Sequence, residues 1–445
     1  MRATHPDTLW RQTAGPKPVF PTATGVRKAD VAVIGGGIAG LTTAMRLAER
    51  GVSTVLLEAE QIGFGASGRN AGFVVPNFSK ADPETVARRL GDEKGRALLD
   101  LVGKGGERVF SLANAMGLGK QAEQTGWLQP AHSQAAARDL QKRVAAWQAL
   151  GRPVTWLDVP EAAARTGMSV YHGALHDASG GMINPLAFVH GLARLALAAG
   201  ATIVEQAPVT GISQEGQGWH LRTPHLTVEA ERVVMCTNAS ETGIASRLGR
   251  AILPLTVFQM ATEPLPEAVT RRFAPHREPV SDTRANIFTY RLDAENRLIS
   301  GGMALSPLTG EKRMGRKIID RLVQELGLSE RPRLAHVWRG TAAVTTDFLP
   351  HLYALGPNFI GAIGCNGRGV AFTTMLGQVL ADAATGADLE SLPVPLAAAR
   401  ALPFRRLAGL APRFYLAKGM LDDRRTMKNR PKGHATTSTM KGELT

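Results

Sequence analysis

The chain has 445 residues, of which 44% are hydrophobic and 20% charged, proportions that exclude a disordered, fibrous or membrane-embedded protein. The formal net charge is +14, but residues 400–445 alone carry 11 Lys or Arg residues against 3 acidic ones. The excess charge is therefore concentrated near the C-terminus, and we expect a solvated, disordered basic tail at residues 424–445 rather than a nucleic-acid-binding surface.

The cysteine content and the N-terminus indicate the compartment. Cys236 and Cys365 are too few for a disulfide framework, and neither has the spacing of a zinc site. The N-terminal lead, residues 1–28, lacks the apolar stretch of a signal peptide, and no continuously apolar run reaches the ~18 residues that span a bilayer. We expect a cytoplasmic, soluble protein with neither nucleic acid nor membrane as a partner; no pattern indicates its oligomeric state.

The first predicted elements form a β-α-β unit. Residues 31–34 are a continuous apolar run that ends in glycines, as expected of a buried parallel strand. A helix is predicted over residues 38–50, with Gly51 closing it, and a second buried strand over residues 54–57. This order within about thirty residues is that of a Rossmann-like nucleotide-binding unit.

The turn between the first strand and the helix matches the pattern GxGxxG. Gly35 permits a tight turn, Gly37 lets the backbone approach a pyrophosphate, and Gly40 permits close packing of the helix on the strand. Ile38 and Ala39 begin the helix, so their N–H groups are expected to face the phosphates. Because the motif lies between a strand and a helix, as it must, it predicts dinucleotide binding.

Two features after the helix distinguish FAD from NAD and NADP as the expected dinucleotide. Glu58, followed by Ala59, ends the second strand, where a carboxylate binds ribose hydroxyls and repels the 2′-phosphate of NADP. A second glycine-rich loop then favours FAD over NAD, because small residues alternate with donors suited to phosphate and ring. Its predicted cofactor-binding residues are Gly65, Ala66, Ser67, Gly68, Arg69, Asn70, Ala71 and Gly72.

The remaining elements predict an α/β protein with an inserted sheet. Helix-forming stretches at 84–116 and 134–150 precede a helix at 185–199 and strands at 201–205, 219–234 and 233–236. The inserted sheet has predicted strands at 257–262, 286–291, 297–301 and 334–340, with an amphipathic helix at 314–326. A strand at 359–363, a glycine-rich turn and a helix at 370–385 closed by Gly386 follow.

The sequence gives no support for a metal site, a serine-hydrolase motif or a nucleotide-binding P-loop. His172 and His176 have the helical i, i+4 spacing, but nearby glycines place them in a strand and turn without a third ligand, so we expect no metal site. The sequence contains no GxSxG or Walker loop.

Together these motifs resemble the FAD-dependent D-amino-acid-oxidase superfamily, which includes glycine, sarcosine and γ-glutamylputrescine oxidases. The resemblance covers most of residues 8–420 and is strongest to the γ-glutamylputrescine oxidase-like branch. It rests on the two glycine loops with Glu58, on 180–185, 233–238, Trp338 with Asp347, and 364–370, and on Tyr290-Arg291 followed by Arg297 and a Gly-Gly pair.

The resemblance implies a Rossmann-like FAD-binding domain with an inserted mixed-sheet substrate domain. The implied FAD-binding segments are 29–105, 160–245 and 341–390, the implied substrate-domain segments are 106–159 and 246–340, and residues 391–423 form a C-terminal segment. Further cofactor-binding residues implied by the family are Val209, Thr237, Asn238, Gly340, Asp347, Gly364, Asn366, Gly367, Arg368, Gly369 and Val370. The last six form the loop beneath the pyrimidine end of the flavin, where many relatives have histidine instead of Arg368.

Two departures from the family bear on the chemistry. The cysteine that tethers flavin in the sarcosine oxidase branch has no evident counterpart, so we expect noncovalent FAD. The lysine that promotes reaction with oxygen there aligns near Ile299, which leaves the electron acceptor open. Arginine holds anions bidentately, so Arg69, Arg291 and Arg339, with Tyr290, are the candidate substrate-positioning residues.

The implied reaction is oxidation of the C–N bond of a small primary or secondary amine to an imine, which is hydrolysed to an aldehyde or oxoacid. The candidate substrates are amino acids, N-methylated or γ-glutamylated amines and aminophosphonates, with O2 as acceptor giving H2O2. The alternatives are a dehydrogenase that uses a quinone or an electron-transfer flavoprotein, a tRNA-modifying flavoprotein, and a noncatalytic flavin-binding subunit.

Overall fold

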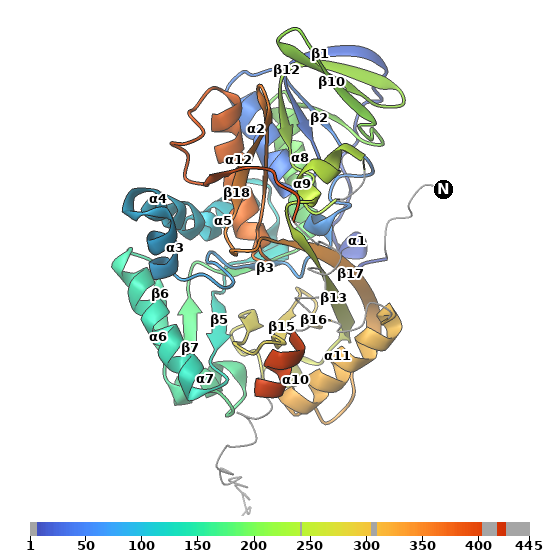
Figure 1. Ribbon diagram of the computed structural model, residues 1–445. Helices are drawn as coiled ribbons and strands as arrows, with labels where there is room; N and C mark the ends of the chain where they lie inside the picture. Colours follow the sequence, from blue (N-terminus) through green and yellow to red (C-terminus); the bar gives the residue numbers. More distant parts are fainter. Residues whose placement is uncertain (1–6, 241–242, 304–308, 403–415, 424–445) are drawn as a thin grey trace, which may run out of the picture.

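The computed structural model describes residues 7–240, 243–303, 309–402 and 416–423. Two lobes lie one above the other: an upper lobe built on a nine-stranded sheet and a lower lobe built on an eight-stranded sheet (Figure 1). Among the described residues, no helix is long and apolar enough to cross a membrane. The expected basic tail at 424–445 lies outside the described residues.

The upper lobe contains the β-α-β unit expected from the sequence. Strand β1 (Gly25–Ile34) pairs in parallel with β2 (Thr54–Leu57) and with β12 (Leu226–Met235), which also pairs in parallel with β19 (Phe359–Ile363). The last four residues of β1 and all of β2 are buried, because helices cover the sheet and the chain supplies apolar side chains to match. The outer members are β9 (Thr202–Val204), β18 (His351–Gly356), β20 (Leu396–Ala397) and the hairpin of β10 (Gly211–Glu215) and β11 (Gly218–Arg222).

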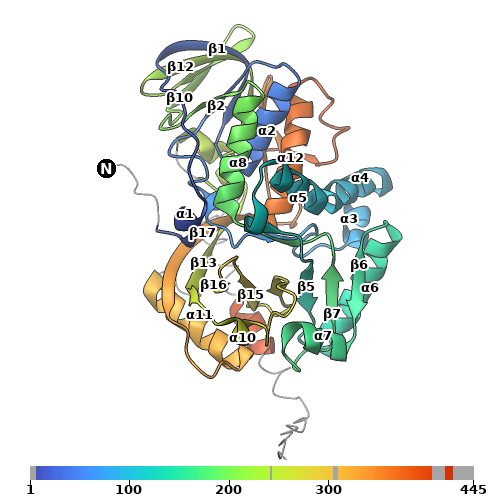
Figure 2. The same ribbon diagram turned by 180° about the vertical axis from the view of Figure 1, so that it is seen from behind.

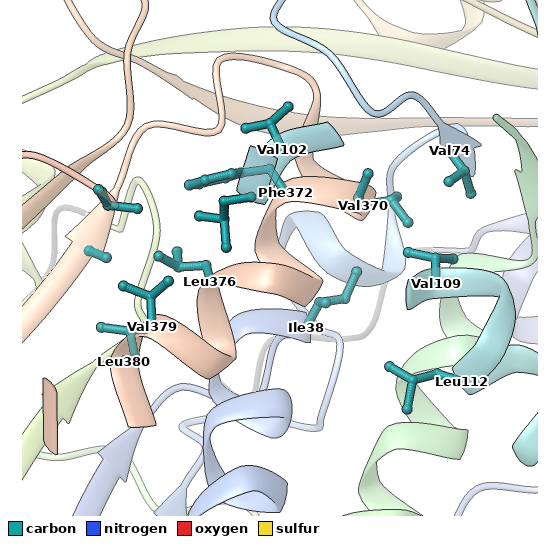
Figure 3. Packing of buried hydrophobic residues seen from close by; sticks show 14 of the residues in the cluster. Ile38, Val74, Val102, Val109, Leu112, Val370, Phe372, Leu376, Val379 and Leu380 are labelled. Atoms are coloured by element: carbon teal, nitrogen blue, oxygen red, sulfur yellow. The ribbon is translucent and has the colours of Figure 1, made fainter. Parts of the chain in front are cut away.

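Three helices far apart in sequence pack against one another in this lobe. Helix α2 (Ile38–Glu49) lies between α8 (Pro185–Ala198) and α12 (Gly369–Ala384), as the rear view makes plain (Figure 2). Side chains of α12, among them Val370 and Leu376, pack with Ile38 and with residues of the neighbouring helices (Figure 3). This packing brings the N-termini of α2 and α12 to the same apolar core.

The lower lobe has a mixed sheet of order β17-β13-β16-β15-β14-β5-β7-β6. Its strands are β5 (Trp127–Pro130), β6 (Val154–Leu157), β7 (Ala174–Asp177), β13 (Leu253–Pro264), β14 (Val280–Ser281), β15 (Thr289–Leu292), β16 (Arg297–Met303) and β17 (Leu334–Val344). Helices α6 (Gln134–Ala149), α7 (Val159–Thr166) and α11 (Glu311–Leu326) cover it, and residues 416–423 form the red helix at its base (Figure 1).

The remaining elements are shorter helices and strands. They are α1 (Leu9–Thr13), β3 (Phe73–Val74), α3 (Pro83–Leu90), α4 (Asp92–Gly103), α5 (Gly105–Ala115), β4 (Ala122–Glu123), β8 (Gly181–Ile183), α9 (Ser246–Gly249) and α10 (Glu267–Thr270), with 3-10 turns at Ala66–Gly68, Gly119–Gln121 and Gly243–Ala245. Strands β3, β8 and β4 form a small third sheet between the two larger ones.

The sheets divide the chain differently from the expected segments at three places. Strand β7 pairs with β5 and β6 in the lower sheet, although residues 160–245 were expected wholly in the FAD-binding domain. Helix α5 packs on α12 of the upper lobe, and β17 continues past residue 340. A β-strand is assigned to a sheet by its partners, and those partners are not visible in a local sequence pattern.

Candidate functional site

A cavity of about 1660 Å³ runs between the two lobes. Its upper wall is built from the turns that follow the carboxyl ends of β1, β2, β12 and β19, the edge where open α/β sheets bind ligands. Its lower wall is one face of the eight-stranded sheet. The GxGxxG turn and the sheet face therefore share one continuous space.

The GxGxxG turn is closely packed against its neighbours. Gly35 has φ +110°, and a Cβ there would lie 2.7 Å from the carbonyl oxygen of Cys236. A Cβ on Gly40 would lie 1.9 Å from the carbonyl oxygen of Gly35, so helix α2 approaches the turn at a distance that only glycine allows. Both findings agree with the expected roles of these glycines, Gly40 acting through packing rather than by lining the cavity.

Glu58 lies at the end of β2 and faces the turn. Its carboxylate accepts hydrogen bonds from the backbone N–H of Gly36 at 2.6 Å and of Glu60 at 2.9 Å. Burial raises the pKa of Glu58 despite these two hydrogen bonds. The side chain lines the cavity together with Ala59, at the position expected for a ribose contact.

The second glycine-rich loop is bound directly to the first. The Ser67 hydroxyl accepts a hydrogen bond from the N–H of Ile38, at the start of α2, at 3.0 Å. Arg69 donates through Nε to the carbonyl of Phe64 at 2.6 Å and stacks on the Phe64 ring. The Asn70 side chain accepts from the N–H of Gly72. The loop is thus held by its own polar side chains.

Two tryptophans from distant segments support this loop from behind. Trp10 of α1 donates its indole N–H to the carbonyl of Asn70 at 2.9 Å, and Trp338 of β17 donates to the carbonyl of Arg69 at 2.8 Å. The two rings pack edge to face with centroids 5.8 Å apart. Consecutive carbonyls of the loop are therefore fixed by a stacked aromatic pair.

The third cofactor loop, between β19 and α12, is held by Asn366. Its side-chain oxygen accepts from the N–H of Thr345 at 2.9 Å, and its amide donates to the carbonyl of Gly364 at 2.8 Å. Arg368 follows at the N-cap of α12, with its guanidinium 4.7 Å from the ring centre of Trp127 in the lower sheet. The loop therefore presents a helix N-terminus to the cavity and reaches across it.

The cavity fits a flavin dinucleotide. The N-termini of two helices, α2 and α12, line it. The carboxylate of Glu58, at the end of β2, lies at the position expected for a ribose contact. The hydroxyl of Thr237, which also lines the cavity, is buried without a hydrogen-bond partner. An unpaired buried hydroxyl is costly unless a ligand engages it.

Most predicted cofactor-binding residues line this one cavity. They are Gly35, Gly37, Ile38, Ala39, Glu58, Ala59, Gly65, Ala66, Ser67, Arg69, Asn70, Ala71, Val209, Thr237, Asn238, Gly340, Gly364, Asn366, Gly367, Arg368, Gly369 and Val370. Gly68 and Gly72 lie behind the wall, where an added Cβ would meet the carbonyls of Gly63 at 2.3 Å and of Ile183 at 2.1 Å.

Asp347 does not line the cavity, contrary to the expected cofactor contact. Its carboxylate lies 3.0 Å from Nε2 of His351 and accepts from the N–H of Leu349 at 3.1 Å. Burial opposes ionisation, but these hydrogen bonds prevail and lower the pKa of Asp347 to about 2. The residue therefore stabilises the turn between β17 and β18.

Three of the four expected substrate-positioning residues also lie outside the cavity wall. Tyr290 is fully buried and donates to the carbonyls of Thr166 and Phe273, both at 3.1 Å. Arg291 is buried and donates to the carbonyls of Gly72 and Ile183.

Arg339 is exposed, 3.6 Å from Glu311. Side chains alternate along a strand, so Thr289 faces the cavity while Tyr290 faces away, and Gly340 faces it while Arg339 does not. Of the four candidates, Arg69 alone lines the cavity.

Ile299 does not line the cavity. It is fully buried in a cluster with Ala261 and Trp338, on the same face of the lower sheet as Gly301 but beneath helix α1. The cavity residues of β16 are Gly301, Gly302 and Met303. The alignment of Ile299 with the oxygen-activating lysine stays a prediction.

Polar residues missed by the sequence analysis line the lower wall. Gln259 lies over Gly301, and its side-chain oxygen is buried without a partner. On β13, the cavity-facing residues 253, 255 and 257 are apolar, and Gln259 is the first polar residue in that alternation. This change along the strand is the sequence signal that could have identified Gln259. The other missed polar groups on this wall include Thr289, His132 and Arg143.

His172 and His176 lie just before and within β7. His176 Nε2 lies 3.2 Å from the carboxylate of Glu278. In the described part of the chain, no group of three His, Cys, Asp or Glu side chains is arranged to hold a metal ion.

A family model described as FAD dependent oxidoreductase matches residues 30–383. The chain belongs to this family. It is 30% identical over 391 residues to the probable oxidoreductase OrdL of Haemophilus influenzae, covering 84% of this chain and 88% of the relative. It is 28% identical to gamma-glutamylputrescine oxidoreductase of Escherichia coli, covering 90% of this chain and 96% of that protein.

Solved structures of the family share the fold. The crystal structure of glycine oxidase from Geobacillus kaustophilus superposes with a TM-score of 0.65 at 22% identity, over 83% of this chain and 98% of that one. The protein is accordingly an FAD-dependent oxidoreductase with a Rossmann-like domain and an inserted mixed-sheet domain.

Proposed function

We propose that the protein oxidises the C–N bond of a small primary or secondary amine to an imine, which water hydrolyses to an aldehyde or oxoacid. The observation that carries this proposal is the single cavity that joins the three cofactor loops to the polar face of the lower sheet. Bound FAD supplies the redox chemistry by accepting the two electrons and the hydrogen removed from carbon. The chain has only to bind and orient the amine.

The lower wall suits a neutral amine. Leu255 and Val257 give it an apolar surface, and Gln259 and Thr289 add uncharged polar groups. An ammonium ion loses solvation in such a space, which favours the unprotonated amine that the reaction requires. The unpaired side-chain oxygen of Gln259 is a ready acceptor for the N–H of that amine.

Amines named in the relatives define the first substrates to test. Gamma-glutamylputrescine is named in one curated relative and glycine in another, which is 26% identical to this chain over 370 residues. We infer the same broad class here and propose noncovalent FAD, with O2 as the electron acceptor and H2O2 as its product. A quinone or an electron-transfer flavoprotein is the competing acceptor.

Anaerobic mixing with single amines tests the proposal. Gamma-glutamylated amines, N-methyl amino acids, amino acids and aminophosphonates should be compared, with the matching alcohols as controls. We expect at least one amine to bleach the flavin absorbance and to yield one aldehyde or oxoacid per flavin. Bleaching by the alcohols but by none of the amines would overturn it.

The acceptor is tested on the same reduced protein. Mixing with oxygenated buffer should restore the oxidised spectrum and produce H2O2 in equal amount. If only a quinone restores the spectrum, the protein is a dehydrogenase.

A further inference from the structure

The helix at residues 416–423 brings the C-terminal part of the chain to the cavity. It packs against the lower lobe and is the red helix of Figure 1. Leu416, the first of these residues, lines the cavity and is only 4% exposed. The match to the family model ends at residue 383, so this part of the cavity wall comes from outside the region that defines the family.

Polar contacts hold this helix against the loop at residues 281–287, which also lines the cavity. One carboxylate oxygen of Asp423 accepts a hydrogen bond from the N–H of Ala285 at 2.9 Å, and the other lies 3.5 Å from Nε2 of His132. The side chains of Asp423 and His132 are both largely buried, so this contact is shielded from solvent. Asp423 therefore fixes the helix to two segments of the lower wall.

Close packing fixes the helix nearer to the cavity as well. A Cβ on Gly419 would lie 2.3 Å from the Cβ of Ala285, so the helix approaches the loop at a distance that only glycine allows. Gly419 and Leu416 are three positions apart on the helix and therefore lie on the same face. The contact at Gly419 thus determines how far Leu416 reaches into the cavity.

Leu416 contributes to the cavity wall rather than to a hydrophobic core. Over the ranges that the structure describes, none of the large hydrophobic clusters includes it. Lys418 and Leu421, on the same helix, are exposed. A buried apolar side chain in this position is suited to contact an apolar part of a ligand.

We propose that Leu416 limits the length of the substrate by closing the cavity at the lower lobe. This inference rests on the proposed function: the amine has to lie beside the flavin, whose binding turns form the upper wall, so the remainder of the substrate extends toward the lower lobe. The part that meets Leu416 is aliphatic, because burial of a methylene against leucine is favourable, whereas a charged group there would lose its hydration. The selected substrates are therefore amines that carry an aliphatic chain of restricted length.

Compounds that cannot be oxidised test this length limit apart from turnover. Alkylamines with a fully substituted carbon next to nitrogen have no hydrogen to lose there, so they cannot form an imine. The FAD-loaded protein should be titrated with a series of these amines of increasing chain length, and with straight-chain alkanamides of matching length, and binding followed by the change in flavin absorbance. We expect the affinity to rise about fourfold for each added methylene until the chain reaches Leu416, and to rise no further beyond that length.

Matched variants assign the limit to Leu416. Leu416→Ala should extend the rising range to longer chains, with a gain of about fourfold for each further methylene that fits, and should leave the shortest compounds unchanged. Leu416→Met keeps most of the side-chain volume and should retain the original limit. Asp423→Ala should also extend the range, because it releases the helix from Ala285. Leu421→Ala, at an exposed position of the same helix, should change nothing.

The same length limit in the unaltered protein and in a folded Leu416→Ala variant would overturn the inference, as would the absence of any length dependence in both series. An equal extension of the range in Leu421→Ala would overturn it too, because the effect would then not be specific to the cavity wall. Failure of every oxidisable amine to bleach the flavin, with a limit that still moves with residue 416, would refute the proposed reaction and leave the role of Leu416 standing.

Discussion

Glu58 carries a testable link between pH and cofactor binding. Its ionised carboxylate can accept the ribose hydroxyls of FAD, whereas the protonated group loses one of its acceptor oxygens. Because burial raises the pKa of Glu58 above 4.5, that loss begins at a higher pH than for an exposed glutamate. We therefore expect the FAD dissociation constant to rise on acidification while the protein is still folded, as measured by equilibrium dialysis with circular dichroism.

Substitution of Glu58 distinguishes this effect from a general weakening of FAD binding at low pH. Glu58→Gln should bind FAD more weakly at neutral pH, by about 1.5 to 3 kcal/mol for each charge-assisted hydrogen bond that is lost. Its affinity should be nearly independent of pH in the same range. A variant with the pH dependence of the unaltered protein would contradict the assignment.

Ile299 allows a second test at the scale of one residue. A lysine there would place a charge in the cluster with Trp338, away from the cavity, so we expect Ile299→Lys to lower the unfolding temperature and to leave flavin reoxidation by oxygen unaccelerated. Stopped-flow reoxidation and thermal unfolding measure the two effects. Faster reoxidation in a folded variant would support the alignment of Ile299 with the oxygen-activating lysine.

At the scale of elements, the sequence predicted best where local pattern and tertiary structure agree. The apolar run of β1, the glycines after it and the helix α2 all follow from short-range rules. The end of β1 and the bounds of α2 agree with the expectation to within one residue, whereas β1 begins at Gly25 instead of residue 31. The parallel pairing of β1 with β12 is consistent with two buried apolar strands.

The site residues of the lower sheet were predicted less well. The choice of Tyr290, Arg291 and Arg339 rested on residue type, whereas the alternation of side chains decides which residue faces the cavity. Alternation turns Tyr290 away from the cavity, whereas Arg291 shares the face of Thr289 and is covered by the backbone at Gly72 and Ile183. Gln259 of β13 and Arg143 of α6 are far apart in sequence and line the same cavity only because of the tertiary packing.

The N-terminal helix α1 should affect cofactor binding although it does not line the cavity. Trp10→Phe removes the indole hydrogen bond to the carbonyl of Asn70 and keeps most of the ring packing. We expect a loss of about 1 kcal/mol in the free energy of unfolding and a weaker affinity for FAD, because the loop around Ser67 loses its support.

Trp219 supplies the matched control for that variant. It also donates to a backbone carbonyl at 2.9 Å, that of Pro357, and also packs edge to face on an aromatic ring, that of Phe359. Trp219→Phe should cost a similar free energy of unfolding without changing FAD affinity. Equal loss of FAD affinity in both variants would show that the effect of Trp10 is not local.

At the scale of the whole molecule, we expect FAD to bind noncovalently and to stabilise the packing of segments that are distant in sequence. Both cavity cysteines are partly buried, and desolvation raises the pKa of each thiol, that of Cys236 to about 12, so the thiols are protonated at neutral pH and poor nucleophiles. We expect acid precipitation to release all the flavin into the supernatant and added FAD to raise the unfolding temperature of the apoprotein. Flavin remaining with the precipitate would contradict noncovalent binding.

The spacing of the three cofactor loops also has a consequence for synthesis. The GxGxxG turn emerges first, but Arg368 and the N-terminus of α12 follow more than 300 residues later. At roughly 5–20 residues per second the ribosome takes on the order of a minute or less to cover that distance. Strand β12 emerges part-way through that interval and β19 only at its end, so the complete FAD site cannot form until nearly the whole polypeptide has been synthesised.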